Sequence, residues 1–269
     1  EHQSIALLME HSLEQVSDQA CACLGLAGVL AMKSFQAEIM AEGLQISLSQ
    51  TNISLGELVD YGLLIRPDMN YQITHALAHT YARERLVVAK DALARLAGHY
   101  NEFSREQVEQ GLKGYARLDA QRDHILAVQS ACNNSGLWKE ARSIVRVLRD
   151  YLDLQGHWLE RIALVQSGLQ AARSDGTRYD EASFLNTLGQ TYSNLGEPRK
   201  AIEFYEQALA IAKEIGYRRG EGGVLGNLGQ TYSDLGEPRK AIEFYEQALA
   251  IAREFKDREI KDKKREGIW

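Results

Sequence analysis

Two stretches decide the fold: LGQTYSNLGEPRKAIEFYEQALAIA at residues 188–212 and LGQTYSDLGEPRKAIEFYEQALAIA at residues 228–252. At a shift of 40 residues they agree at 24 of 25 positions, and the sole difference is Asn194 against Asp234. Self-similarity with a period of about 20 to 50 residues is the signature of a solenoid or repeat array. The chain is therefore predicted to contain stacked copies of one structural unit.

Each copy has the spacing of two helices joined by a tight turn. Gly196 suits a left-handed residue at the end of the first helix, and Pro198 suits the first turn of the second. The apolar residues of each helix recur at helical spacing, so each helix has one face to bury. Neither hairpin hides these faces alone, so neighbouring hairpins are predicted to stack. The two faces comprise Leu185, Leu188, Tyr192 and Leu195, and Ala201, Ile202, Tyr205, Ala208, Leu209 and Ala212.

The same register continues backward from the two good copies. Apolar and glycine positions in residues 141–180 match those of residues 181–220, which predicts a degenerate copy there. A partial unit is predicted over residues 98–140. Beyond Ile260 the pattern stops, and the charged segment from Phe255 to Glu266 is predicted to form a solvated capping helix.

The first ninety residues contain no recognisable copy of the 40-residue repeat. Residues 64–66 and 71–73 have the pattern of two short strands around a turn, and one long helix is predicted from Thr74 towards Leu96. Three helices, a two-stranded wing and a following helix describe a winged-helix fold. The preceding helical patterns cover residues 5–14, 17–30, 34–41 and 55–63.

The predicted fold class is all-α, with the wing as a short β-hairpin. Each segment then receives one structural role. The predicted divisions are a winged-helix domain and linking helix at 1–97, a partial repeat at 98–140, a degenerate repeat at 141–180, full repeats at 181–220 and 221–260, and a cap or tail at 261–269.

Within each full copy, a set of seven positions recurs: Leu188, Gly189, Tyr192, Gly196, Ala201, Tyr205 and Ala208. This spacing resembles the tetratricopeptide repeat in its longer, 40-residue variety. The resemblance implies a right-handed superhelix of helix hairpins whose concave side is lined by first helices and binds protein. Amide side chains on that side would hydrogen-bond an extended peptide, and the alternative is that they are merely solvated. The implied groove residues are Asn186, Gln190, Asn194, Asn227, Gln230 and Asp234.

The segment LVDYGLLIRPDMNYQITHALAHTYARERL, residues 58–86, resembles the winged-helix domain of the NB-ARC or STAND signal-transduction ATPases. Bacterial members often run from ATPase through winged helix to tetratricopeptide array, so the chain is similar to the C-terminal part of such a protein, without the ATPase domain. In that family a His after the wing touches the nucleotide's β-phosphate. His75 matches that position, although Ala76 replaces the acid that often follows. The alternative is a packed or half-exposed histidine at a helix start.

The charge of the chain argues against nucleic acid as a partner. A net charge of −6 and a pI near 5.7 leave no surplus of Lys and Arg to neutralise phosphates. The segment in the place of a recognition helix, from Ser54, carries Glu57 and Asp60 and no Arg or Lys to contact bases. DNA binding by the winged helix is therefore the less favoured alternative.

Other features predict a cytoplasmic protein. The most apolar run, residues 20–32, is shorter than the ~20 residues needed to cross a bilayer, so no membrane partner is expected. The first residues carry acids where a signal peptide carries bases. The number of cysteines is odd, and all of them are interpreted as reduced thiols in the core: Cys21, Cys23 and Cys132.

No residue set for catalysis is present in the sequence. The segment GLAGVLAMKS from Gly25 has Met32 where a P-loop requires Gly before Lys. His75 and His79 have the spacing of a zinc helix, but Ala76 stands where a metalloprotease needs Glu, and no third ligand is evident. The chain is therefore predicted to have no enzymatic activity, cofactor or metal.

These observations predict a protein-protein interaction scaffold that forms the sensor part of a signal-transduction ATPase. Its expected partners are a protein or peptide ligand, the ATPase domain of the same full-length chain and, through the repeat ends, a second copy. A free-standing adaptor is the first alternative. A DNA-binding winged-helix regulator is the second.

Overall fold

The computed structural model describes the backbone of residues 11–265 and the side chains of residues 11–256. It divides into two compact units, Glu1–Tyr151 and Leu152–Trp269. In the described part of the chain, helices follow one another through short turns, and the sheet has two strands. The predicted all-helical fold with a short β-hairpin is confirmed. The helix predicted over residues 5–14 lies largely outside the described residues.

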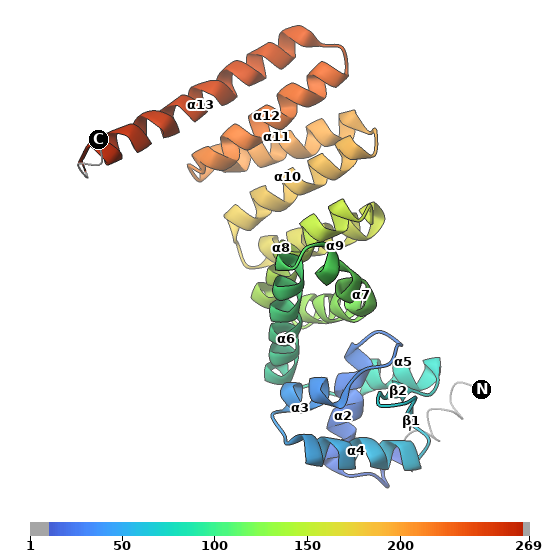
Figure 1. Ribbon diagram of the computed structural model, residues 1–269. Helices are drawn as coiled ribbons and strands as arrows, with labels where there is room; N and C mark the ends of the chain where they lie inside the picture. The colour runs from blue at the N-terminus through green and yellow to red at the C-terminus, as the bar shows by residue number, and fades with distance from the viewer. Residues whose placement is uncertain (1–10, 266–269) are drawn as a thin grey trace. The chain divides into compact units, whose positions relative to one another are not determined.

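The first unit opens with helices and a β-hairpin in the predicted order (Figure 1). The two strands pair antiparallel, with Leu64 opposite Ile73. A backbone bridge between Phe35 and Tyr71, with N–O distances of 2.8 Å in both directions, joins the connection after the first helix to this hairpin. The elements are α2 (Asp18–Val29), α3 (Ala37–Leu44), α4 (Leu48–Asp60), β1 (Leu64–Ile65), β2 (Gln72–Ile73) and α5 (Ala76–Arg85).

Two helices begin elsewhere than the sequence predicted. α4 begins at Leu48 and not at residue 55, because Ser47 and Gln50 form a capping box in which each side chain bonds the other's backbone. The polar run that follows has no apolar periodicity, which hid this start. α3 begins at Ala37 and not at residue 34, because the bridge to the hairpin holds Phe35 extended.

The single helix predicted from Thr74 to Leu96 is wrong. The structure has two helices, α5 and α6 (Lys90–Glu109), and Leu86 between them is extended, with φ −86° and ψ 131°. Leu86 and Val88 lie over Gly25 of α2, at 3.4 and 3.6 Å from the place where a Cβ on that glycine would be. The packing of this segment against α2 therefore stabilises the chain more than a continued helix would. Interrupting the helix costs less here because β-branched residues have a lower helix propensity.

α6 and α7 (Leu112–Asn134) form a helix hairpin. The chain turns at Gly111, whose φ of +60° favours glycine. Gly114 brings the start of α7 against α6, since a Cβ there would lie 1.8 Å from the carbonyl oxygen of Gln107. The two helices therefore approach as closely as their backbones allow.

The middle of α7 contacts the connection between α2 and α3. Lys33 pairs with Asp123 at 2.5 Å, and the Nε2 atom of His124 lies 3.1 Å from the carbonyl oxygen of Ser34. The hydrogen bond from Lys33 lowers the pKa of Asp123, whereas burial lowers the pKa of His124 and keeps its ring neutral. α8 (Trp138–Leu154) follows and ends in the second unit.

In the second unit, successive helices pack side by side in chain order (Figure 1). A glycine with φ between +67° and +74° stands in each connection, at Gly176, Gly196, Gly216 and Gly236. These glycines are 20 residues apart, so each 40-residue repeat consists of two helical halves of equal length. The helices are α9 (Trp158–Ser174), α10 (Arg178–Asn194), α11 (Pro198–Glu214), α12 (Arg218–Asp234) and α13 (Pro238–Arg265).

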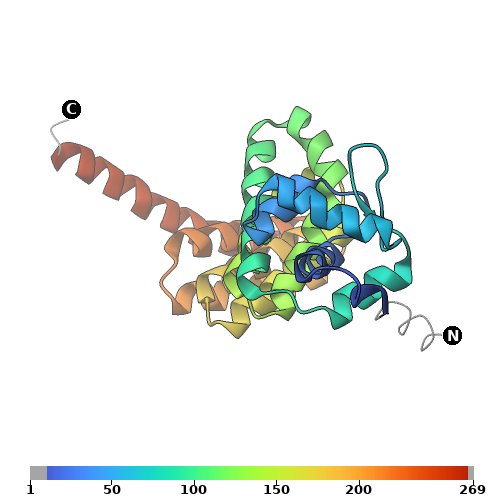
Figure 2. The same ribbon diagram turned by 90° about the horizontal axis from the view of Figure 1, so that it is seen from below.

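α13 is one uninterrupted helix, as Figure 2 also shows. It has 28 residues where its counterpart α11 has 17, so it continues beyond the end of the last repeat hairpin. The capping helix predicted from Phe255 to Glu266 is not a separate element: residues 255–265 continue α13, and Glu266 lies outside the described residues. No helix in the described part of the chain is both long and apolar enough to cross a membrane.

Close packing within each hairpin depends on small residues. Ala201 and Ala208 are fully buried, and a Cβ on Gly189 would lie 2.5 Å from the ring of Tyr205. Tyr192 stacks on Phe204 across the hairpin, with ring centroids 5.3 Å apart. The same stack recurs in the last copy, between Tyr232 and Phe244, at 5.4 Å.

The degenerate copy replaces one of these small residues by a buried arginine. Arg161 stands at the position of Ala201, and only 2% of its side chain is exposed. Its guanidinium donates to Asp153 at 2.9 Å and to the Thr191 hydroxyl of α10 at 2.7 Å. A buried charge needs such partners, so polar contacts join α9 to α10 where the other copies use alanine.

Candidate protein-binding surfaces

The structure places the six predicted groove residues on the first helices of the two full repeats. Asn186, Gln190 and Asn194 fall on one face of α10 at intervals of four residues. Their side chains are half-buried or exposed. The remaining three lie on α12: Asn227, Gln230 and Asp234.

Several of these side chains bond one another. Asn227 donates from Nδ2 to Oδ1 of Asn186 at 2.9 Å, which links α12 to α10. Gln230 donates to Asp234 at 2.8 Å, and its own amide oxygen accepts from the Tyr245 hydroxyl at 3.1 Å. The polar row is thus organised by its own hydrogen bonds, and the amide groups not used in these bonds can form further ones.

The row is not strictly repeated. The residue 40 positions after Asn186 is Gly226, and Asn227 stands where α10 has the buried Thr187. Gly223 likewise replaces Ser183, so α12 has no side chain at either of these two positions. A Cβ on Gly223 or on Gly226 would meet nothing within 4 Å.

We expect Gly223→Ala combined with Gly226→Ala to stabilise the protein by about 1 to 2 kcal/mol, because each alanine lowers the entropy of the unfolded chain without a clash. Urea denaturation followed by circular dichroism measures the gain. Gly229→Ala is the matched control in the same helix, because its Cβ would lie 2.7 Å from the Tyr245 ring. An unchanged midpoint in the double variant would contradict the expectation.

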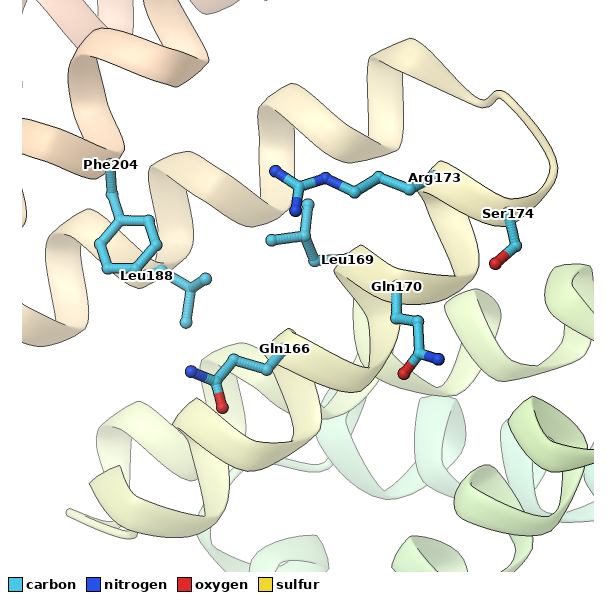
Figure 3. Close-up of a pocket in the computed structure, with 7 residues that line it drawn as sticks. All are labelled: Gln166, Leu169, Gln170, Arg173, Ser174, Leu188 and Phe204. Carbon is cyan, nitrogen blue, oxygen red and sulfur yellow. The ribbon is translucent and has the colours of Figure 1, made fainter.

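A pocket that the sequence did not reveal lies among α9, α10 and α11. Leu169 and Arg173 point toward Leu188 and Phe204 (Figure 3). The pocket has a volume of about 510 Å³, and its floor is apolar. Three polar residues complete its rim: Gln166, Gln170 and Ser174.

Arg173 lies at the edge of this pocket in an ion pair. Its Nε donates at 2.9 Å to Glu181, whose side chain is only 8% exposed. Arg178 also pairs with Glu181 and with Glu214 of α11, so ion pairs hold the pocket's walls. The surface is suited to an apolar side chain. The following junction has Ala210 in place of Gln170, so this part of the polar rim is not repeated.

The two histidines four residues apart do not form a pair. His75 is the exposed N-cap residue of α5 and makes no capping bond. His79 is buried, with Nε2 2.7 Å from the carbonyl oxygen of Leu30. Among the described residues, no group of three or more His, Cys, Asp or Glu is placed to hold a metal ion.

The cysteines are free thiols in the structure, and two of them belong to the core. Burial raises the pKa of Cys23 and of Cys132 to about 12. Both are therefore neutral at physiological pH, and neutral thiols are poor nucleophiles.

Stacked hairpins with a polar face on their first helices define a helical-repeat scaffold, the class of protein that supports protein-protein interactions. The repeats are of the tetratricopeptide kind, because the family model for the tetratricopeptide repeat matches residues 150–214 and, overlapping with them, 180–254. Tetratricopeptide proteins are generally non-enzymatic scaffolds. No curated protein matches the chain.

The solved structures that are similar to the chain include the following three. A signal transduction ATPase with numerous domains (STAND) protein with a tetratricopeptide repeat sensor, from Pyrococcus horikoshii, is 15% identical with a TM-score of 0.40. BtubC (BKLC) from P. vanneervenii is 18% identical with a TM-score of 0.38. A protein with nearly identical TPR-like repeats from Podosopora anserina is 18% identical with a TM-score of 0.26.

The three alignments differ in extent. The Pyrococcus alignment covers 93% of this chain and 46% of the other, so this chain spans under half of that protein's length. The second alignment covers 62% of this chain and 75% of BtubC, and the third covers 61% and 95%.

Proposed function

We propose that the chain is the sensor and scaffold part of a signal-transduction ATPase, and that its repeats bind an extended segment of a protein ligand. The observation that carries this proposal is the polar face shared by α10 and α12, with Asn186 bonded to Asn227 at its centre. Backbone groups of an extended peptide match amide side chains without strict sequence requirements. We propose the cytoplasm as the place of action, which the free thiols support.

The first unit supports the sensor part of the proposal. Its helices, β-hairpin and following helix have the order of a winged helix, and the Phe35–Tyr71 bridge adds a third extended segment to the hairpin. His75 is exposed at the start of α5, where its ring is open to contact the phosphate of a nucleotide held by an ATPase domain. A free-standing adaptor would need the repeats but gives His75 no role.

A displayed peptide library, panned against the 269-residue chain, tests the binding face. We expect enriched peptides to bind roughly tenfold more weakly to the double variant Asn186→Ala, Gln190→Ala, because two hydrogen bonds of ordinary strength amount to about that factor. Fluorescence anisotropy with a labelled peptide measures the change. Gln247→Ala is the control, because this exposed amide on α13 bonds only its own helix, at Glu243.

Two results would overturn the proposal in different ways. Peptides that bind the double variant as tightly as the original chain would show that the ligand does not use this face. An upstream reading frame without a nucleotide-binding P-loop would leave the scaffold and remove the ATPase, which favours the adaptor.

A further inference from the structure

α11 and α13 share one sequence but not one environment. The fifteen residues PRKAIEFYEQALAIA are identical at 198–212 and 238–252. In α13, Ile242 is 56% exposed and Leu249 is 49% exposed, whereas the equivalent residues of α11 are half-buried. Ala252 is exposed where Ala212 is 1% exposed. The difference arises from the helix that follows, not from the side chains themselves.

The helix that covers this face in α11 is α12. It presents Glu221, Val224 and Thr231, which are buried and fall at helical spacing along one side. The corresponding side of α10 faces α9, where Glu181 accepts from Arg173 at 2.9 Å and Thr191 accepts from Arg161. The occupant of such a face is thus a helix with an acid in its first turn and apolar residues after it.

α13 carries the matching cation. Arg253 stands where α9 has Arg173, and it has no ion pair among the residues whose side chains the structure describes. Near it lies the apolar stripe of Ile242, Tyr245 and Leu249. We call these residues with Ala252 and Arg253 the α13 face. An approaching helix in the orientation of α12 would place its first turn beside Arg253.

We propose that the α13 face binds an amphipathic helix of a partner protein, antiparallel to α13, with an acidic first turn and an apolar stripe of the α10 type. A second copy of α13 fits less well, because its first turn contains Arg239 and Lys240 and would meet Arg253 with like charge. The α13 face adjoins the polar face at the hydrogen bond from Tyr245 to Gln230. The two proposals are tested at different helices, with Leu249→Glu on α13 and Asn186→Ala on α10, so either can fail alone.

The probe is a fluorescein-labelled, end-capped peptide with the sequence of residues 177–195, which contains α10. We expect it to bind the full chain, and we expect Leu249→Glu to weaken binding at least roughly tenfold, because it places a charge in an apolar contact. Leu159→Glu is the matched control, because Leu159 is 80% exposed on α9, away from this face. A peptide with Glu181→Lys should also bind more weakly, through repulsion from Arg253.

Circular dichroism establishes that the Leu249→Glu chain remains folded, which its exposure at this position favours. Absence of saturable peptide binding, or equal affinity for the original chain and the Leu249→Glu variant, would overturn the proposal. Light scattering that shows a dimer dissociated by Leu249→Glu would also overturn it, because the occupant would then be a second copy.

Discussion

Tyr205→Ala is expected to destabilise the protein by about 3 to 5 kcal/mol, the cost of removing a large aromatic side chain from a core. Tyr205 is 2% exposed, and its ring lies directly against Gly189, which has no side chain of its own. Burial also raises the pKa of its hydroxyl, so the ring stays neutral. Urea denaturation of the original chain and the variant measures the loss.

The chain contains its own control for this substitution. Tyr245 has the same neighbours in sequence but is 39% exposed, so Tyr245→Ala removes less buried surface and is expected to cost well under half as much. Equal costs at the two positions would contradict the difference in burial. They would instead indicate that a helix covers α13 in solution.

Gly114→Ala is expected to disrupt the hairpin of α6 and α7, at a cost at or above the upper end of the roughly 1 to 3 kcal/mol typical of overpacking. The added Cβ would lie 1.8 Å from the carbonyl oxygen of Gln107. A side chain could rotate away from such a clash, but a backbone oxygen moves only with its helix. Thermal denaturation followed by circular dichroism measures the effect.

Gly98→Ala is the control for helix propensity in α6. A Cβ on Gly98 would meet nothing within 4 Å, so the substitution is expected to be neutral or to stabilise by up to about 1 kcal/mol. A Gly114→Ala variant as stable as Gly98→Ala would show that the two helices lie farther apart than described.

The repeat was predictable because its two copies are nearly identical in sequence, and this can be seen without knowing how the side chains pack. The apolar spacing around Leu188 and Tyr205 predicted two helices, and Gly196 with Pro198 located the turn between them. The division into halves of 20 residues was less visible, because the halves share little beyond a glycine in the left-handed conformation. Gly196 and Gly236 are each followed two residues later by proline, but Gly176 and Gly216 are not, so the turns at these two glycines were harder to locate.

Secondary structure predicted from local sequence was wrong where tertiary contacts determine the backbone conformation. Residues 74–96 have continuous helical periodicity, yet the contacts of Leu86 and Val88 with Gly25 on α2 break the helix. The start of α4 was readable in principle, because Ser47 and Gln50 have the spacing of a capping box.

Of the two candidate surfaces, one could be predicted from the sequence and the other could not. The polar face of α10 and α12 was predicted from positions within a repeat, and its ligand role stays a prediction. The pocket beside Arg173 was not predicted, because Leu169, Leu188 and Phe204 come from three helices. Their meeting depends on how a degenerate copy stacks on a full one, which no single helix pattern contains.

The shared sequence of α11 and α13 also creates an ambiguity during folding. α10 has the same complementary surface for either helix, so a nascent chain can dock α13 where α11 belongs and leave α11 and α12 looped out. The shorter loop favours the correct partner by an entropy on the order of 2 kcal/mol. The packing of α12 against α11, which the looped-out arrangement lacks, favours it as well. Misregistered pairing of this kind would act as a kinetic trap, and every sequence difference that accumulates between the copies would make it shallower.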